Sequence, residues 1–73
     1  MKAKKLFGKE VIDVDAKVVG KIVDIELDVS NASIPSILVK SGLTKKLSIL
    51  PQDIGKIGDK VVLKIAKDKV LKA

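Results

Sequence analysis

The chain of 73 residues lacks cysteine, histidine, tryptophan, tyrosine and arginine, and its only aromatic side chain is Phe7. Without cysteine there is no disulfide, no zinc–thiolate site and no thiol nucleophile. Without histidine, the usual general base and metal ligand near neutral pH is missing. The composition therefore argues against an enzyme, and we expect no catalytic site, no metal and no cofactor.

All 15 basic residues are lysines, and the formal net charge is +6. Lysine is a hydrated point charge, whereas base reading favours the arginine fork and single-strand binding favours stacked aromatic rings. The lysines are spread from Lys2 to Lys72 and are interleaved with acidic residues. Attraction to a nucleic-acid backbone remains the weaker alternative to a lysine-rich surface that serves solubility.

Long hydrophobic runs are also absent. The basic start is not followed by the apolar run of a signal peptide, and no stretch approaches the roughly 20 residues that span a bilayer. We therefore expect a cytoplasmic protein that does not insert into a membrane. The length suits one domain over residues 1–73, with a core at about 6–66 and a lysine-rich C-terminal extension at 67–73.

The residues that are present favour β structure. Valine and isoleucine number 19 against eight leucines, and β-branched side chains suit a pleated surface. Residues 23–29 alternate strictly between apolar and acidic, which predicts a half-buried strand that continues a segment bent at Gly20. The other expected strands cover residues 10–14, 34–40, 45–50 and 60–66, with a helical turn at 51–54 and a short strand or frayed tail at Val70 and Leu71.

Strand parity assigns side chains to the two faces of these strands. The residues expected to point inward are Ile12, Val14, Val23, Ile25, Leu27, Val29, Ile37, Val39, Leu47, Ile49, Val61, Leu63 and Ile65. Four apolar residues of opposite parity are expected to point outward: Val11, Leu38, Leu50 and Val62. They are either isolated surface residues or, if adjacent, one patch that binds a partner.

Asp24, Glu26 and Asp28 are expected along one face of a strand, with alternate residues about 7 Å apart. Calcium and magnesium ligands usually come from a loop that wraps the ion, so this stripe does not predict a metal site. It is either a solvated face paired with lysines or a partner-facing acidic stripe, through which two molecules would associate stripe against lysines. Asp13 and Asp15 flank a tight turn, and we expect them to bond backbone amides there.

Two segments resemble the PRC-barrel family. The first half carries LFGKEVID at residues 6–13 and KVVGKIVDIELD at 17–28. The second half carries Leu50-Pro51, Asp53-Ile54 and then IGDKVVL at residues 57–63. The resemblance covers roughly residues 6–66. Ala16 stands where the family often has glycine, which leaves the type of that turn open.

The resemblance implies an all-β fold, a small closed or nearly closed barrel of about six short strands with little helix, and no enzymatic activity. It further implies an interaction module like the short archaeal PRC-barrel proteins of cell division, which pair with themselves or a sister barrel and bind the division-ring anchor SepF. A homodimer is expected on this basis, with the outward apolar residues or the acidic stripe as the contact. The alternative is a ribosome-associated factor that resembles the barrel of RimM.

Overall fold

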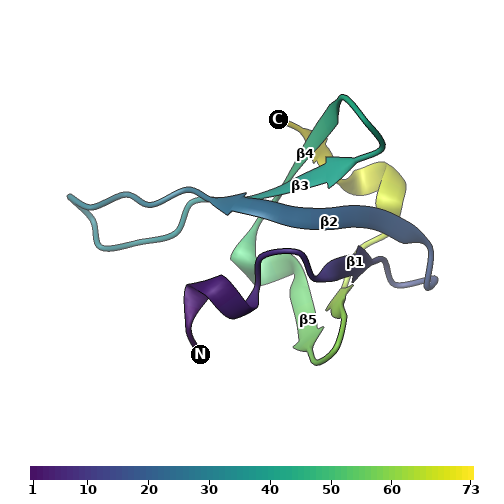
Figure 1. Ribbon diagram of the computed structural model, residues 1–73, viewed down its shortest axis with the longest axis horizontal. Coiled ribbons are helices and arrows are strands. Elements are labelled where there is room, and N and C mark those ends of the chain that lie inside the picture. Colours follow the sequence, from purple (N-terminus) through teal and green to yellow (C-terminus); the bar gives the residue numbers. More distant parts are fainter.

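The computed structural model describes all residues from 1 to 73 and confirms the all-β class. The regular elements are seven short strands and three single 3₁₀ turns (Figure 1). They are η1 (Ala3–Lys5), β1 (Glu10–Ile12), β2 (Val18–Ile25), β3 (Ile37–Ser41), β4 (Lys45–Ile49), η2 (Pro51–Asp53), β5 (Ile54–Ile57), β6 (Val61–Leu63), η3 (Lys67–Lys69) and β7 (Leu71–Lys72).

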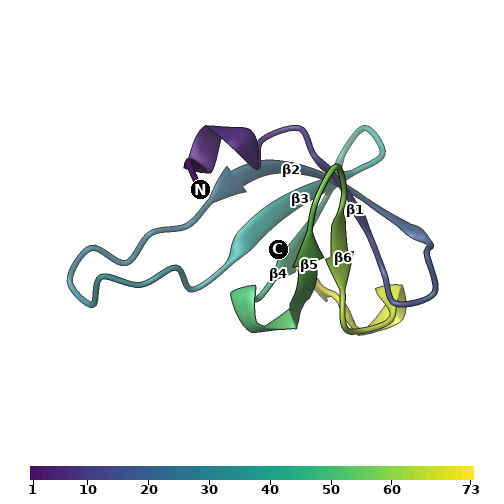
Figure 2. The same ribbon diagram turned by 90° about the horizontal axis from the view of Figure 1, so that it is seen from below.

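The strands form one mixed sheet in the order β5-β6-β1-β2-β3-β4-β7. Only β1 and β6 pair in parallel, and all other neighbours are antiparallel. The sheet curls so that β5 and β6 lie across from β3 and β4 (Figure 2). The edge strands β5 and β7 do not pair with each other, so hydrogen bonds do not close the expected barrel.

The curled sheet encloses an aliphatic core of nine buried residues. They are Val11, Val19, Ile22, Ile37, Val39, Leu47, Ile49, Val61 and Leu63. The inward positions expected in β3, β4 and β6 are all confirmed, because the simple alternation of these strands matches their pairing. Ile25 and Ile65 are partly buried and pack against the same core.

The phase expected for β1 is wrong by one residue. Val11, expected to point outward, is fully buried, whereas Ile12 is half-buried and Val14 is exposed. The inward position after Val11 belongs to Asp13, a carboxylate that is 1% exposed. In a hydrophobic pattern an acidic residue is normally assigned to the solvent-facing side of a strand. Because Asp13 is buried, the faces assigned to the residues next to it were reversed.

In β2 the expected inward position is confirmed for Ile25, which packs against the core, and is wrong for Val23. Val19 and Ile22 enter the core, and the pairing with β3 shifts between Ile22 and Asp24. Val23 is the extra residue of this bulge and is exposed rather than inward. Leu27 and Val29, also expected inward, lie beyond the end of β2 and are exposed.

Residues 26–36, here called the arm, connect β2 to β3 and extend away from the barrel (Figure 1). The arm continues the β2–β3 hairpin, because the Glu26 N–H donates to the Ser36 carbonyl at 3.0 Å. Farther out, Asp28 and Ser33 exchange backbone hydrogen bonds of 2.8 and 3.0 Å. The alternating segment is thus a two-stranded ribbon with no second layer of the sheet packed on it.

Candidate interaction surface

The four apolar residues expected to form an outward patch do not gather. Val11 belongs to the core and is unavailable to a partner. Leu38, Leu50 and Val62 are half-buried, and Leu38 on β3 is separated from Val62 on β6 by β2 and β1. The fold therefore does not unite these positions on one exposed surface.

Three of the eleven large apolar side chains that are exposed lie on the arm. Leu27 is 69% exposed, Val29 87% and Ile34 44%. If the Asp28–Ser33 register continues by one residue, Leu27 lies opposite Ile34, and both line a shallow depression of about 320 Å³ together with Val29 and Ala32. The alternation of residues 23–29 led us to expect a buried face here. In the structure it marks an apolar face that the rest of the monomer leaves uncovered.

The acidic residues expected to form a stripe are in three different situations. Asp24 lies within β2 and accepts a hydrogen bond from the Ile25 N–H at 2.8 Å. Asp28 holds the arm turn, since it accepts from the side-chain amide of Asn31 at 2.7 Å and from the Asn31 N–H at 3.2 Å. These bonds, led by the side-chain amide, hold the pKa of Asp28 below its ordinary value. Glu26 is exposed and makes no side-chain hydrogen bond or ion pair, so it is the most available of these three carboxylates.

The charges of the chain are segregated along the sequence. Residues 22–39 contain no lysine and carry a net charge of −3 from Asp24, Glu26 and Asp28. The remainder holds all 15 lysines and carries +9. The arm and the end of β2 next to it are therefore acidic and apolar, whereas the rest of the molecule is basic.

A row of like charges crosses the sheet near the β3–β4 turn, at the end of β3 away from the arm. The register places Lys21 of β2 directly opposite Lys40 of β3, and Lys40 opposite Lys46 of β4. Partners in an antiparallel ladder project from the same face, so the three exposed ammonium groups share one surface. Glu10 is opposite Lys21 on the other side, but its carboxylate pairs with Lys60 at 2.9 Å.

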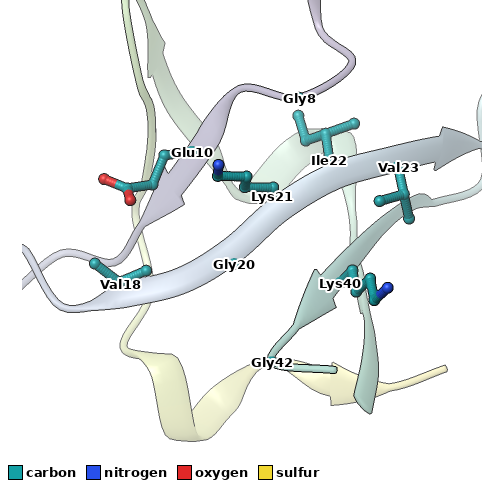
Figure 3. Close-up of a pocket in the computed structure, with 9 residues that line it drawn as sticks. All are labelled: Gly8, Glu10, Val18, Gly20, Lys21, Ile22, Val23, Lys40 and Gly42. Carbon is teal, nitrogen blue, oxygen red and sulfur yellow. The ribbon is translucent and has the colours of Figure 1, made fainter. Parts of the chain in front are cut away.

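A hollow of about 440 Å³ lies along β2, and the backbone of Gly20 forms part of its lining. A Cβ at Gly20 would collide with the Lys40 carbonyl and would lie 2.8 Å from Val39 Cγ1. Figure 3 shows Val18 and Val23 on either side of Gly20 along β2, with Lys21 and Lys40 at the rim. We call this site the β2 hollow; its apolar part is formed by exposed valines, and its charged lining comprises Lys21, Lys40 and Glu10.

The buried carboxylate of Asp13 organises the turn after β1. Its oxygens accept hydrogen bonds from the backbone N–H groups of Asp15, Lys17 and Lys67, each at 2.8 Å. Burial raises the pKa of Asp13, but the three N–H groups and the charge of Lys17 outweigh that effect and hold the pKa below its ordinary value. The expected turn chemistry is confirmed for Asp13, which also ties η3 to β1, and this role is structural.

A family model for the PRC-barrel domain matches residues 1–70, so this chain belongs to the PRC-barrel family. No curated protein sequence gives a significant match. None of the helical segments is long and apolar enough to cross a membrane. The family match accords with the curled sheet.

Proposed function

We propose that this protein is a non-enzymatic interaction module of the PRC-barrel type that works as a cytoplasmic adaptor. Its role would be in archaeal cell division, where it associates with itself or a sister barrel and binds a SepF-like anchor of the division ring. The observation that carries the proposal is the arm, where Leu27 and Val29 are exposed on a ribbon that the barrel does not cover. Exposed apolar surface of this kind is typical of sites that bind proteins.

The residues of the module also favour binding over chemistry. Its one buried carboxylate, Asp13, is occupied by three backbone N–H groups. The serines have no histidine to activate them, since the chain contains none. An adaptor needs only a stable scaffold and a presented surface, which the barrel and the arm supply.

The direct test is capture of partners from extracts of the cells that make this protein, with and without nuclease, read by mass spectrometry. We expect division proteins or a sister barrel to be captured whether or not nuclease is present. The double variant Leu27→Ser, Val29→Ser should lose them. Leu43→Ser, at the 90% exposed tip of the β3–β4 turn, is the matched control and should retain them.

The second candidate is an RNA- or ribosome-associated role, and the row formed by Lys21, Lys40 and Lys46 favours it. Capture of ribosomal proteins that disappear after nuclease treatment would support this candidate and contradict the adaptor. RNA binding through lysines should also weaken steeply between low and physiological salt. Binding through the apolar face of the arm should depend much less on salt.

A further inference from the structure

We propose that residues 1–9, together with Lys21 and Lys40, form a surface that binds anionic lipid headgroups. We call this surface the basic face. The inference goes beyond the proposed function, because the ligand is a lipid surface and not a protein. The association is peripheral: the barrel lies on the lipid surface and does not enter the hydrocarbon layer.

The first argument is the charge of residues 1–9. This segment contains four lysines and no acidic residue. Lys2, Lys4 and Lys5 are exposed, and none of them forms an ion pair within the molecule. Clusters of lysine of this kind are attracted to the negative potential of anionic lipids.

The second argument is that the same segment exposes apolar side chains. Phe7, the only aromatic residue of the chain, is 47% exposed, and Met1 is 80% exposed. Leu6 packs against the core, so it fixes the end of η1 on the barrel while Phe7 remains on the outside. Apolar side chains among lysines are typical of segments that lie at the boundary between headgroups and acyl chains.

The third argument is the position of the segment beside β2. The Gly8 N–H donates to the Ile22 carbonyl at 2.8 Å, and the Ile22 N–H donates to the Lys9 carbonyl at 3.1 Å. Gly8 also lines the β2 hollow together with Lys21 and Lys40 (Figure 3). The two sheet lysines therefore extend the charge of residues 1–9 over one continuous surface.

Two carboxylates border the basic face and do not neutralise it. The Glu10 carboxylate is paired with Lys60 at 2.9 Å, and Asp24 accepts a hydrogen bond from the Ile25 N–H. The basic face itself has six lysines, so a net charge of +4 remains when both carboxylates are counted against it.

The side chains of the basic face favour a lipid surface over a nucleic acid. Binding of single strands uses several stacked aromatic rings, and base reading favours the arginine fork. This face has one aromatic ring, and the chain contains no arginine. Met1 has no ring to stack on a base, whereas a lipid boundary accepts both Met1 and Phe7.

The first test measures binding of the full chain to sucrose-loaded vesicles by sedimentation. We expect binding to vesicles of equal parts phosphatidylcholine and phosphatidylglycerol, and none to phosphatidylcholine alone. Lys4→Glu with Lys5→Glu should lower the partition coefficient about tenfold or more. Lys67→Glu with Lys69→Glu is the matched control in η3, which lies on the opposite side of the molecule from η1 (Figures 1 and 2). It should lower the coefficient by less than about threefold, because charges far from the lipid surface are screened.

The second test uses the absence of tryptophan from the chain. Phe7→Trp introduces a single fluorophore, and its emission should shift to shorter wavelength on the anionic vesicles as the ring leaves water. Val14→Trp is the control at a position that is 56% exposed. Its neighbour Asp13 binds the Lys67 N–H of η3, so Val14 lies on the side away from the lipid, and its emission should not shift.

Equal losses for the two lysine pairs would overturn the inference, because binding would then follow total charge and not this face. An unmodified protein that does not bind the anionic vesicles would also contradict it, as would a bound Phe7→Trp variant without a shift. Binding to polyuridylate in place of the vesicles would assign the lysines to RNA and contradict the lipid surface. Far-UV circular dichroism establishes that each variant is folded. The neutral pair Lys4→Gln with Lys5→Gln should show a smaller loss in the same direction as the charge reversal.

Discussion

The two ends of the β2–β3 hairpin carry similar side chains in different surroundings. Near the barrel, Ile22 and Val39 face each other and are buried. In the arm, Leu27 and Ile34 have comparable hydrophobicity but lie on the uncovered ribbon. An apolar face therefore stabilises the monomer only where the sheet curls over it, and the same face farther out remains available for binding.

Within the barrel, removal of the Asp13 carboxylate should have the largest effect on stability. Asp13→Ala deprives three backbone N–H groups of their acceptor at once, and buried donors without acceptors are costly. We expect the largest loss of stability of any single substitution discussed here. Urea unfolding followed by circular dichroism measures it, and a midpoint like that of the unmodified protein would contradict the role of Asp13.

Low pH should destabilise the fold through the same Asp13 carboxylate. The pKa of Asp13 is lower in the folded protein than in the unfolded chain. Its contribution to stability is therefore fully present above the unfolded value of about 3.9 and is lost as the pH falls through the lower folded value. Asp13→Asn should flatten the pH dependence of the urea midpoint in this acid range. An unchanged acid slope in that variant would assign the dependence to other carboxyls.

The same substitution in the two regions tests the comparison directly. Leu63 is 2% exposed in the core and Leu27 is 69% exposed in the arm. Leu63→Ala should lower the free energy of unfolding by about 2–5 kcal/mol, as for buried leucines in general. Leu27→Ala should change it by less than about 0.5 kcal/mol in the monomer at low concentration. Similar losses for both would mean that the arm is part of the folding core.

The close approach of β2 and β3 at Gly20 predicts the next smaller effect on stability. In Gly20→Ala the new Cβ meets the Lys40 carbonyl and Val39 Cγ1, so β2 and β3 must separate. We expect a loss of about 1–3 kcal/mol, the usual cost of overpacking. Gly58→Ala is the matched control, because a Cβ there has no atom within 4 Å, and it should be nearly neutral. Equal stabilities would argue against a tight crossing at Gly20.

The smallest expected effect is a gain. Ala16, after β1, has φ of 63° and Ala32, in the arm turn, has φ of 50°, both in the left-handed region. Ala16→Gly should raise the free energy of unfolding by about 1 kcal/mol, because glycine has no Cβ to strain there. Ala32→Gly relieves the same strain in a segment that adds little to the core, so its gain in thermal unfolding should be smaller. The reverse ranking would contradict the division between barrel and arm.

Much of the strand framework could be predicted from the sequence. Simple alternation located β3, β4 and β6, and Pro51 indicated the η2 turn. The Asp15-Ala16 turn also lies where expected, with Ala16 in the conformation that glycine adopts more readily. These predictions are confirmed because turn residues and alternating patterns determine structure through interactions between residues close in the sequence.

The rest required three-dimensional information. The face that each β1 residue occupies depends on the burial of Asp13. That burial requires hydrogen bonds from backbone N–H groups, and one of them, from Lys67, is too distant in the sequence for a local pattern to reveal. β5 was not predicted, because Gly55 and Gly58 are typical turn residues. The strand forms through its pairing with β6, which the local sequence does not show. For the arm, alternation shows that two faces differ but not whether anything covers the apolar one.

The role of the arm in association is tested most directly by shortening it and measuring sedimentation velocity with interference optics. Replacing residues 27–35 by Asn-Gly supplies a two-residue hairpin turn between Glu26 and Ser36, whose backbones are already hydrogen-bonded. We expect the shortened protein to sediment as a compact monomer at concentrations where the full chain is a dimer. A shortened protein that still forms the dimer, or one that sediments as an unfolded chain, would contradict the claim that the arm serves association and not the fold.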